Sequence, residues 1–239
     1  MNLSAKDYNR LYRLQDKFLS WWVGLKFPFY LTGGTSLGRF YLNHRFSEDL
    51  DFFVNNDKEY LNYVDELKNK ITDHFTVDQK QLLFAGDFTR FFIEEKGIYL
   101  KIELVNEIGN YIGEPAIYKY GKIDTPVNIL ANKLTAIVGR DEPKDIFDII
   151  HIALNYSFNW PDIFYYAKQK AIINELDIVQ RLVSFPVEWL ENVNWLITPL
   201  DSDETLDLLK HVADDFLLGL QNSLGKEKIP IELAKPMTL

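Results

Sequence analysis

The spacing of hydrophobic residues changes near Pro126, and this change restricts the fold more than any other feature of the sequence. Before Pro126, several short segments alternate apolar and polar residues, as strands do, and they are mixed with a few helical patterns. After Pro126, apolar residues recur every three or four positions, which is the spacing of helices. We therefore expect an α+β fold, with an α/β domain over residues 1–125 and a helical domain over residues 126–239.

The same patterns predict the individual elements. Helices are expected over residues 4–22, 57–72, 127–139, 144–155, 161–172, 174–183 and 203–222, with a short helix after the glycines that follow residue 32. Strands are expected over residues 29–32, 49–54, 75–79, 81–86, 89–95 and 98–105. Ser4 and Asp7 have the spacing of a capping box at the first helix. Residues 107–126 read as a loop, and residues 225–239 as a poorly ordered tail.

Composition excludes several kinds of site. The chain has no cysteine, which rules out disulfides, thiolate nucleophiles and cysteine-bound zinc, and its four histidines lie far apart. No apolar run approaches the roughly 20 residues of a membrane helix, and the N-terminus lacks a signal segment, so we expect a cytoplasmic protein. The net charge of −9 argues against a broad nucleic-acid surface. A local basic patch remains possible, with the candidate members Arg39, Arg45, Lys133, Arg140 and Lys144.

Two carboxylates mark the most informative segment. Asp49 and Asp51 are two residues apart in a predicted strand, so their side chains point to the same face. Adjacent carboxylates repel each other unless a cation neutralises them, and magnesium prefers oxygen ligands. Glu103 in the predicted strand 98–105 is the best third ligand for a two-ion site, with manganese as an alternative ion. Weaker alternatives for this third position are Asp87, Glu94 and Glu95.

A double glycine precedes these aspartates. Gly33 and Gly34 lie between a predicted strand and a short helix, where backbone amide groups favour phosphate. Ser36 adds a hydroxyl donor in the helix. Arg45 and Ser47 are placed either to contact a triphosphate or to brace the carboxylates. No Gly-Lys-Ser/Thr follows, so the segment is not a Walker loop.

Basic residues recur in the helical half. Lys133 and Arg140 are two helical turns apart and share a face, from which they could clamp phosphates. Asp145 is placed to brace one or both of these cations. Lys144 and Asp148 are four residues apart, and the simplest interpretation is an ion pair on a helix surface.

Three segments together resemble a known family. GGTSL (33–37), HRFSEDLDFF (44–53) and KLTAIVGRDEPKDIFDI (133–149) are similar to the AbiEii/AbiGii nucleotidyltransferases, within the wider DNA polymerase β-like superfamily. The resemblance covers about residues 29–155 and implies a polymerase β-like sheet with flanking helices and a C-terminal helical bundle. Relatives commonly carry Asp at the third carboxylate, where this chain has Glu103.

The resemblance also implies a function. It implies a toxin of a toxin–antitoxin or abortive-infection system that uses a nucleoside triphosphate and magnesium, releases pyrophosphate, has a cognate antitoxin and modifies an acceptor such as the tRNA 3′ end. The implied metal ligands are Asp49, Asp51 and Glu103, which with Lys133 and Asp145 form the catalytic set. The implied nucleotide-binding residues are Gly33, Gly34, Ser36, Arg45, Ser47, Lys133 and Arg140.

Two alternatives remain open. The acceptor could be a protein or a small molecule, which the acidic composition favours slightly. The chain could instead be an inactive relative that binds a nucleotide or a partner protein. The presence of Asp49, Asp51 and Lys133 favours an enzyme, because a binding protein has no need of paired carboxylates.

Overall fold

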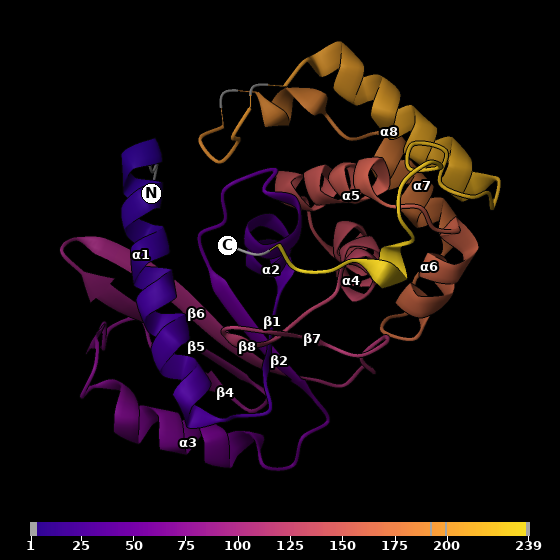
Figure 1. Ribbon diagram of the computed structural model, residues 1–239. Helices are drawn as coiled ribbons and strands as arrows, with labels where there is room; N and C mark the ends of the chain where they lie inside the picture. Colours follow the sequence, from indigo (N-terminus) through magenta and orange to yellow (C-terminus); the bar gives the residue numbers. More distant parts are fainter. Residues whose placement is uncertain (1–3, 192, 199, 238–239) are drawn as a thin grey trace.

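A mixed sheet lies at the centre of the protein (Figure 1). The computed structural model describes residues 4–191, 193–198 and 200–237. The sheet has the order β3-β5-β6-β2-β1-β8-β7, and β4 pairs with β5. Its strands are β1 (Tyr30–Thr32), β2 (Leu50–Asn55), β3 (Thr76–Val77), β4 (Leu83–Ala85), β5 (Phe88–Glu95), β6 (Ile98–Glu107), β7 (Ala116–Tyr118) and β8 (Gly121–Ile123). Strand β2 runs antiparallel to β1 and parallel to β6, so these three strands form the middle of the sheet.

One face of the sheet is covered by helices α1 (Ala5–Trp22) and α3 (Tyr60–Ile71). Alternate residues of β2 point into this layer, where the ring of Phe52 lies 4.2 Å from that of Trp22 and 6.2 Å from that of Phe18. Tyr60 of α3 donates its hydroxyl to the carbonyl of Leu104 on β6. Each such buried side chain contributes about 1.5–3 kcal/mol to folding. The intervening residues of β2 and β6, which include Asp51, are therefore directed to the opposite face.

The first helix begins where the sequence predicts. The Ser4 side chain accepts a hydrogen bond from the Asp7 backbone amide, and the Asp7 carboxylate accepts one from the Ser4 amide. This reciprocal pair is the predicted capping box. It satisfies two backbone donors that a helix N-terminus otherwise leaves without partners.

The second half of the chain is helical and gathers on one side of the sheet (Figure 1). Its helices are α4 (Pro126–Gly139), α5 (Pro143–Asn155), α6 (Trp160–Lys168), α7 (Glu175–Val183) and α8 (Ser202–Leu217). Proline starts α4 and α5, where the missing amide proton costs no hydrogen bond. Helix α4 begins at the predicted boundary, but buried residues of both halves form one continuous core. None of the described helices is long and apolar enough to cross a membrane.

The structure corrects three sequence predictions about local order. The predicted loop 107–126 contains β7 and β8, and β8 extends the sheet by pairing in parallel with β1. Three-residue strands are too short to give a clear alternating pattern. The described part of the predicted disordered tail is packed: Ile231 is 1% exposed, and the Met237 amide donates to the Phe40 carbonyl. The last helix, predicted to reach residue 222, ends at Leu217, and Gly219 just beyond it has a positive φ of 63°.

Candidate active site

A cleft of about 680 Å³ opens between the uncovered face of the sheet and helix α4. Asp49, Asp51 and Glu103 line its sheet wall, and Lys133 and Arg140 line its helical wall. The short helix α2 (Gly33–Leu37), which follows β1 and leads into a π-helical turn (Gly38–Leu42), brings its two glycines to the same cleft. The cleft therefore gathers most of the candidate residues from segments far apart in the sequence.

The three candidate metal ligands form an acidic cluster on the sheet. Asp51 of β2 and Glu103 of β6 are paired in register, and Asp49 directly precedes β2. Lys101, two residues before Glu103, places its Nζ atom 2.8 Å from Asp49 Oδ2 and 3.5 Å from Glu103 Oε1. Arg90 of β5 donates its Nε–H to Glu103 Oε1 at 2.6 Å. Two cations thus compensate Asp49 and Glu103.

Asp51 has no such ion pair among the described residues. Burial, followed by the negative charges of Asp49 and Glu103, raises the pKa of Asp51 to about 7. Burial also opposes ionisation of Glu103, but Lys101 and Arg90 hold the pKa of that carboxyl below its ordinary value. Asp51 is therefore the carboxylate whose negative charge most lacks a neighbouring cation.

This charge imbalance and the all-oxygen donor set fit a hard divalent cation such as magnesium. As the side chains stand, no three acidic or histidine groups within the described residues are arranged to hold a metal ion. The Lys101 ammonium already contacts two of the three carboxylates. The residues fit the metal by their chemistry, and metal binding requires Lys101 to move away from Asp49 or Glu103.

Both glycines of α2 are required by close packing. Gly33 has a φ of +68°, and a Cβ atom added there would lie 2.9 Å from Asp51 Oδ2. A Cβ atom added at Gly34 would lie 2.3 Å from Arg45 Nη2. The double glycine therefore lets the backbone pass directly beside the acidic cluster and beside the buried guanidinium of Arg45.

Ser47 and Ser36, two candidate nucleotide-binding residues, lie in different places relative to the cleft. The hydroxyls of Ser47 and Thr35 are hydrogen-bonded at 2.8 Å, Thr35 also donates to the carbonyl of Asp49, and Ser47 lines the cleft. Ser36, by contrast, is fully buried, and its hydroxyl donates to the Asp124 carbonyl at 3.2 Å. The prediction that the Ser36 hydroxyl faces the site is therefore wrong, because the side chain points into the core and does not line the cleft. Thr35, the preceding residue of the same helix, instead directs its hydroxyl to the Asp49 carbonyl.

Arg45 and Lys133, which both line the cleft, meet at the buried carboxylate of Asp148, the centre of an ion-pair network. Arg45 donates to both Asp148 oxygens, at 2.6 and 2.7 Å, and Lys133 Nζ lies 2.7 Å from Oδ2. His44 Nε2 lies 2.8 Å from Oδ1. Burial opposes ionisation of Asp148, but Arg45 and Lys133 hold the pKa of this carboxyl well below its usual range. Arg45 was predicted either to contact a triphosphate or to brace Asp49 and Asp51, but its guanidinium pairs with Asp148 instead.

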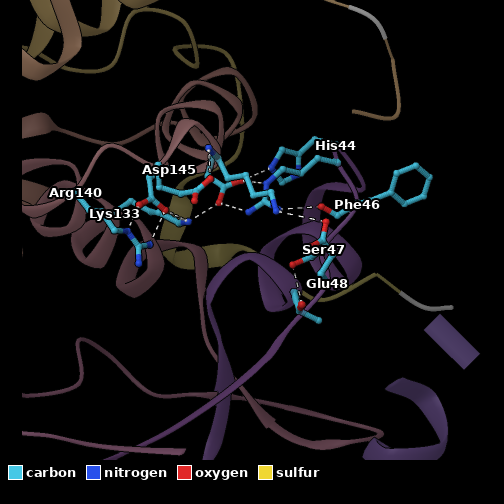
Figure 2. Close-up of polar contacts among 12 residues, drawn as sticks. His44, Phe46, Ser47, Glu48, Lys133, Arg140 and Asp145 are labelled. Carbon is cyan, nitrogen blue, oxygen red and sulfur yellow. Dashed lines mark hydrogen bonds and ion pairs between the residues drawn. The ribbon is translucent and has the colours of Figure 1, made fainter. Parts of the chain in front are cut away.

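Asp145 extends the same network. Its carboxylate accepts from Lys133 at 2.6 Å and from Arg140 at 2.7 and 3.0 Å (Figure 2). The predicted brace is confirmed, and it holds both cations at once. The predicted pair between Lys144 and Asp148 is wrong, since Lys144 Nζ lies 3.6 Å from Glu48 Oε1 instead. Lys133 is thus fixed between two carboxylates at the wall of the cleft.

Comparison with known proteins identifies the family of the chain. A family model described as "Nucleotidyl transferase AbiEii toxin, Type IV TA system" matches residues 21–177, more than half of the chain. The chain belongs to the AbiEii family of nucleotidyltransferase toxins. No curated protein matches it.

Solved structures share the fold of this AbiEii family member. JHP933 from Helicobacter pylori is 21% identical, with a TM-score of 0.58, and the match covers 89% of this chain and 92% of that one. MenT4, a nucleotidyltransferase toxin from Mycobacterium tuberculosis H37Rv, is 18% identical, with a TM-score of 0.59 and coverage of 90% and 85%. The mixed sheet with its flanking helices is therefore a nucleotidyltransferase fold.

The predicted basic patch of this AbiEii family member does not form as expected. Arg39 has a 7% exposed side chain that pairs with Asp16 and stacks on Tyr12 at 4.3 Å. The Arg45 side chain is 2% exposed, whereas that of Arg140 is 60% exposed. Lys133 is buried as well, so three of the five predicted members are buried in ion pairs and do not form an open positive surface.

Three contributors to the site were missed at the sequence level. Lys101 shares a face with Glu103 by strand alternation, so the pattern of β6 contained the signal. Arg90 reaches Glu103 only through the register of β5 with β6, which the sequence does not specify. Asp148 was assigned to a helix surface because its partner Arg45 is far away in the chain.

Proposed function

We propose that this protein transfers a nucleoside monophosphate from a nucleoside triphosphate to a hydroxyl group, and that the cleft between the sheet and α4 is the active site. One observation carries the proposal: a carboxylate cluster faces two cations, Lys133 and Arg140, that Asp145 holds across a single cleft. Nucleotidyl transfer needs this pairing, because the reaction depends on positioning and on charge stabilisation more than on covalent chemistry.

The triphosphate would lie against the glycines and the helical wall. The backbone amides of Gly33 and Gly34 and the Ser47 hydroxyl are donors for phosphate oxygens on one side. Lys133 and Arg140 supply positive charge on the other side. Since Asp145 and Asp148 fix the Lys133 ammonium before substrate arrives, little reorganisation is needed when charge develops on the departing pyrophosphate.

Asp49, Asp51 and Glu103 are the residues that would hold magnesium, or manganese in its place. When bound there, two such ions supply Lewis-acid stabilisation of the attacking and leaving oxygens. Since the pKa of Asp51 is raised to about 7, a cation that approaches this carboxyl would favour its ionised form. Lys101 holds Asp49 and Glu103 together until then.

The acceptor has a separate route to the acidic cluster. A second hollow of about 420 Å³ shares Glu48, Asp49 and Lys101 with the cleft and is also lined by Phe92 and Tyr99. A hydroxyl entering there would reach the acidic cluster at Asp49. We propose an RNA 3′ end as the acceptor, with tRNA as the form that the family implies. The aromatic side chains of the hollow can stack on a terminal base.

Membership of a type IV toxin–antitoxin family implies a cognate antitoxin for this chain. A nucleotide donor and an RNA acceptor are both cytoplasmic molecules, so we propose that the protein acts in the cytoplasm. These two proposals concern where and with what the toxin works, and they do not change the chemistry of the cleft.

The direct experiment is transfer of label. The purified protein is incubated with magnesium and each α-labelled nucleoside triphosphate, with total RNA in one reaction and total protein in another. We expect label on RNA, concentrated at tRNA size, with release of pyrophosphate. Label on protein would show that the acceptor is a protein and not RNA. Bound nucleotide without any labelled product would support the inactive, nucleotide-binding alternative.

A further inference from the structure

Part of the cleft is lined by apolar side chains that the proposed phosphate chemistry does not use. On the sheet, Phe53 and Val105 lie two residues beyond Asp51 and Glu103 on the same face, and both are half-buried and line the cleft. On α4, Ile129 lies one turn before Lys133 and lines the same cleft. Both walls therefore carry an apolar stretch beside their charged groups, and on the sheet Glu107 lines the cleft beyond Val105.

The apolar stretches of the two walls lie towards the same end of the cleft. The Ile112 amide, just after β6, donates to Asn128 Oδ1 at 3.1 Å, which places the N-terminal end of α4 near the C-terminal end of β6. At the other end of α4, Arg140 is close enough to Asp51 for that carboxylate to help raise the Arg140 pKa, after Asp145 and Glu142. Helix α4 thus runs opposite to β6, and Ile129, Phe53 and Val105 all lie on the same side of the acidic cluster, towards the C-terminal ends of β2 and β6.

The spacing matches a nucleotide. Two residues of a strand advance roughly 6.6 Å, so the Phe53 ring lies about one ribose beyond the carboxylates that would face the α-phosphate. This ring is held in place by Tyr30, whose centroid is 6.3 Å away. Tyr30 is itself buried and makes an edge contact with Tyr111 at 4.8 Å. An aromatic platform is therefore fixed where a nucleobase would arrive.

One polar side chain that lines the same cleft is not satisfied by the described residues. Asn132 is half-buried on α4 and lines the cleft. Its backbone carbonyl accepts from Thr135, but its carboxamide makes no hydrogen bond within the part of the chain that the structure describes. A carboxamide offers both a donor and an acceptor, which is the pattern on the edge of a nucleobase.

We propose that Phe53, Val105, Ile129 and Asn132 form the nucleobase subsite, in which Phe53 stacks on the base and Asn132 hydrogen-bonds its edge. The inference rests on the proposed function and assigns the specificity-determining residues of the same cleft. Stacking on Phe53 accepts any base, because every base has an aromatic face. Selection among the four nucleotides therefore falls to Asn132.

Calorimetric titration with magnesium and no acceptor tests the subsite. The ligands are the four nucleoside triphosphates and ribose 5-triphosphate, which lacks a base. The Phe53→Leu variant keeps an apolar side chain and loses the aromatic face, so its Kd for the nucleotides should rise about 5- to 150-fold. Its Kd for ribose 5-triphosphate should not change. Asn132→Ala should bring the four nucleotide Kd values closer together.

Phe84→Leu is the matched control, since Phe84 is 44% exposed on β4 and outside the cleft, and it should bind every ligand as wild type does. Phe53→Tyr, which keeps the aromatic face, should also retain affinity. Equal weakening of ribose 5-triphosphate by Phe53→Leu would overturn the subsite alone, as would wild-type protein that binds ribose 5-triphosphate as tightly as the nucleotides. Wild-type protein that binds none of these ligands would overturn the proposed function and the subsite with it.

Discussion

Asp51 and Glu103 occupy paired positions on the parallel strands β2 and β6, so two residues 52 positions apart in the sequence face the same cleft side by side. A shift of one residue in this register would turn one of the carboxylates into the core that Phe52 and Leu104 now fill. The buried faces of the strands therefore set the geometry of the acidic cluster.

Lys101→Met should increase affinity for divalent cations in the absence of nucleotide. The substitution removes a positive charge 2.8 Å from Asp49 and 3.5 Å from Glu103 while keeping an unbranched side chain. The Coulomb interaction between two unit charges at such a distance is about 4 kcal/mol at the effective dielectric constant of a partly exposed site. We therefore expect the Kd for manganese to be at least roughly tenfold lower in the variant. Calorimetry measures this Kd, with Lys122→Met as the control at an exposed position outside the cleft. Unchanged or weaker binding would show that Lys101 does not compete with the metal.

Gly34→Ala should destabilise the protein. The added methyl group would lie 2.3 Å from Arg45 Nη2, and this guanidinium cannot swing away without breaking its two hydrogen bonds to buried Asp148. We expect a loss of about 1–3 kcal/mol in the free energy of unfolding, measured by urea denaturation. Gly24→Ala is the matched control, because no atom lies within 4 Å of its added methyl group. Equal stability of the two variants would contradict the close packing described at Gly34.

Asp148→Asn should be among the most destabilising single changes in the site. It leaves the buried Arg45 guanidinium and the Lys133 ammonium with less compensating charge, and breaking such a buried pair costs about 3–5 kcal/mol. The pKa of Asp148 is lower in the folded than in the unfolded protein, so its stabilising effect is complete above about pH 4 and is lost as the pH falls towards the folded value. Urea denaturation from pH 3 to pH 7 should show the two proteins converging below about pH 4. A constant difference over that range would be inconsistent with this ionisation.

Much of the fold could be predicted from the sequence because its patterns are local. The capping box of Ser4 and Asp7 and the alternation of β2 are properties of a few consecutive residues. Strand β8 escaped prediction because its three residues are held by pairing with β1, which is a long-range contact. The register of β5 and the packing of the C-terminal tail on Phe40 depend on tertiary structure in the same way.

The residues of the candidate site could likewise be predicted where their pattern is local and not where it depends on long-range contacts. Asp49, Asp51 and the glycines were found because their spacing alone implies chemistry. Ser36 was misplaced because sequence does not show which side of a short helix faces the cleft, and its hydroxyl in fact bonds to the Asp124 carbonyl. The partners of Asp148 come from two distant segments, so no local pattern identified it as the centre of an ion-pair network.

Lys133→Met should abolish most transfer and leave metal binding intact. Lys133 is the cation that Asp145 and Asp148 jointly fix at the phosphate side of the cleft, and it does not contact the acidic cluster. Removal of one preorganised charge-stabilising donor costs on the order of 100- to 1,000-fold in turnover. Single-turnover transfer assays and manganese calorimetry measure the two properties separately. Loss of metal affinity together with activity would contradict the division of roles between the two walls.

The most direct measurement is transfer of labelled nucleoside monophosphate by Asp51→Asn. The asparagine side chain keeps the shape of Asp51 and removes a carboxylate whose ionised form is disfavoured by burial and by its acidic neighbours, which raise its pKa to about 7. The folded variant should therefore be no less stable at pH 8 than wild type. Transfer to the acceptor should nevertheless fall by at least about 100-fold, because the charge that attracts the metal is gone. Wild-type transfer by a correctly folded Asp51→Asn protein would contradict the assignment of this cleft as the nucleotidyltransferase active site.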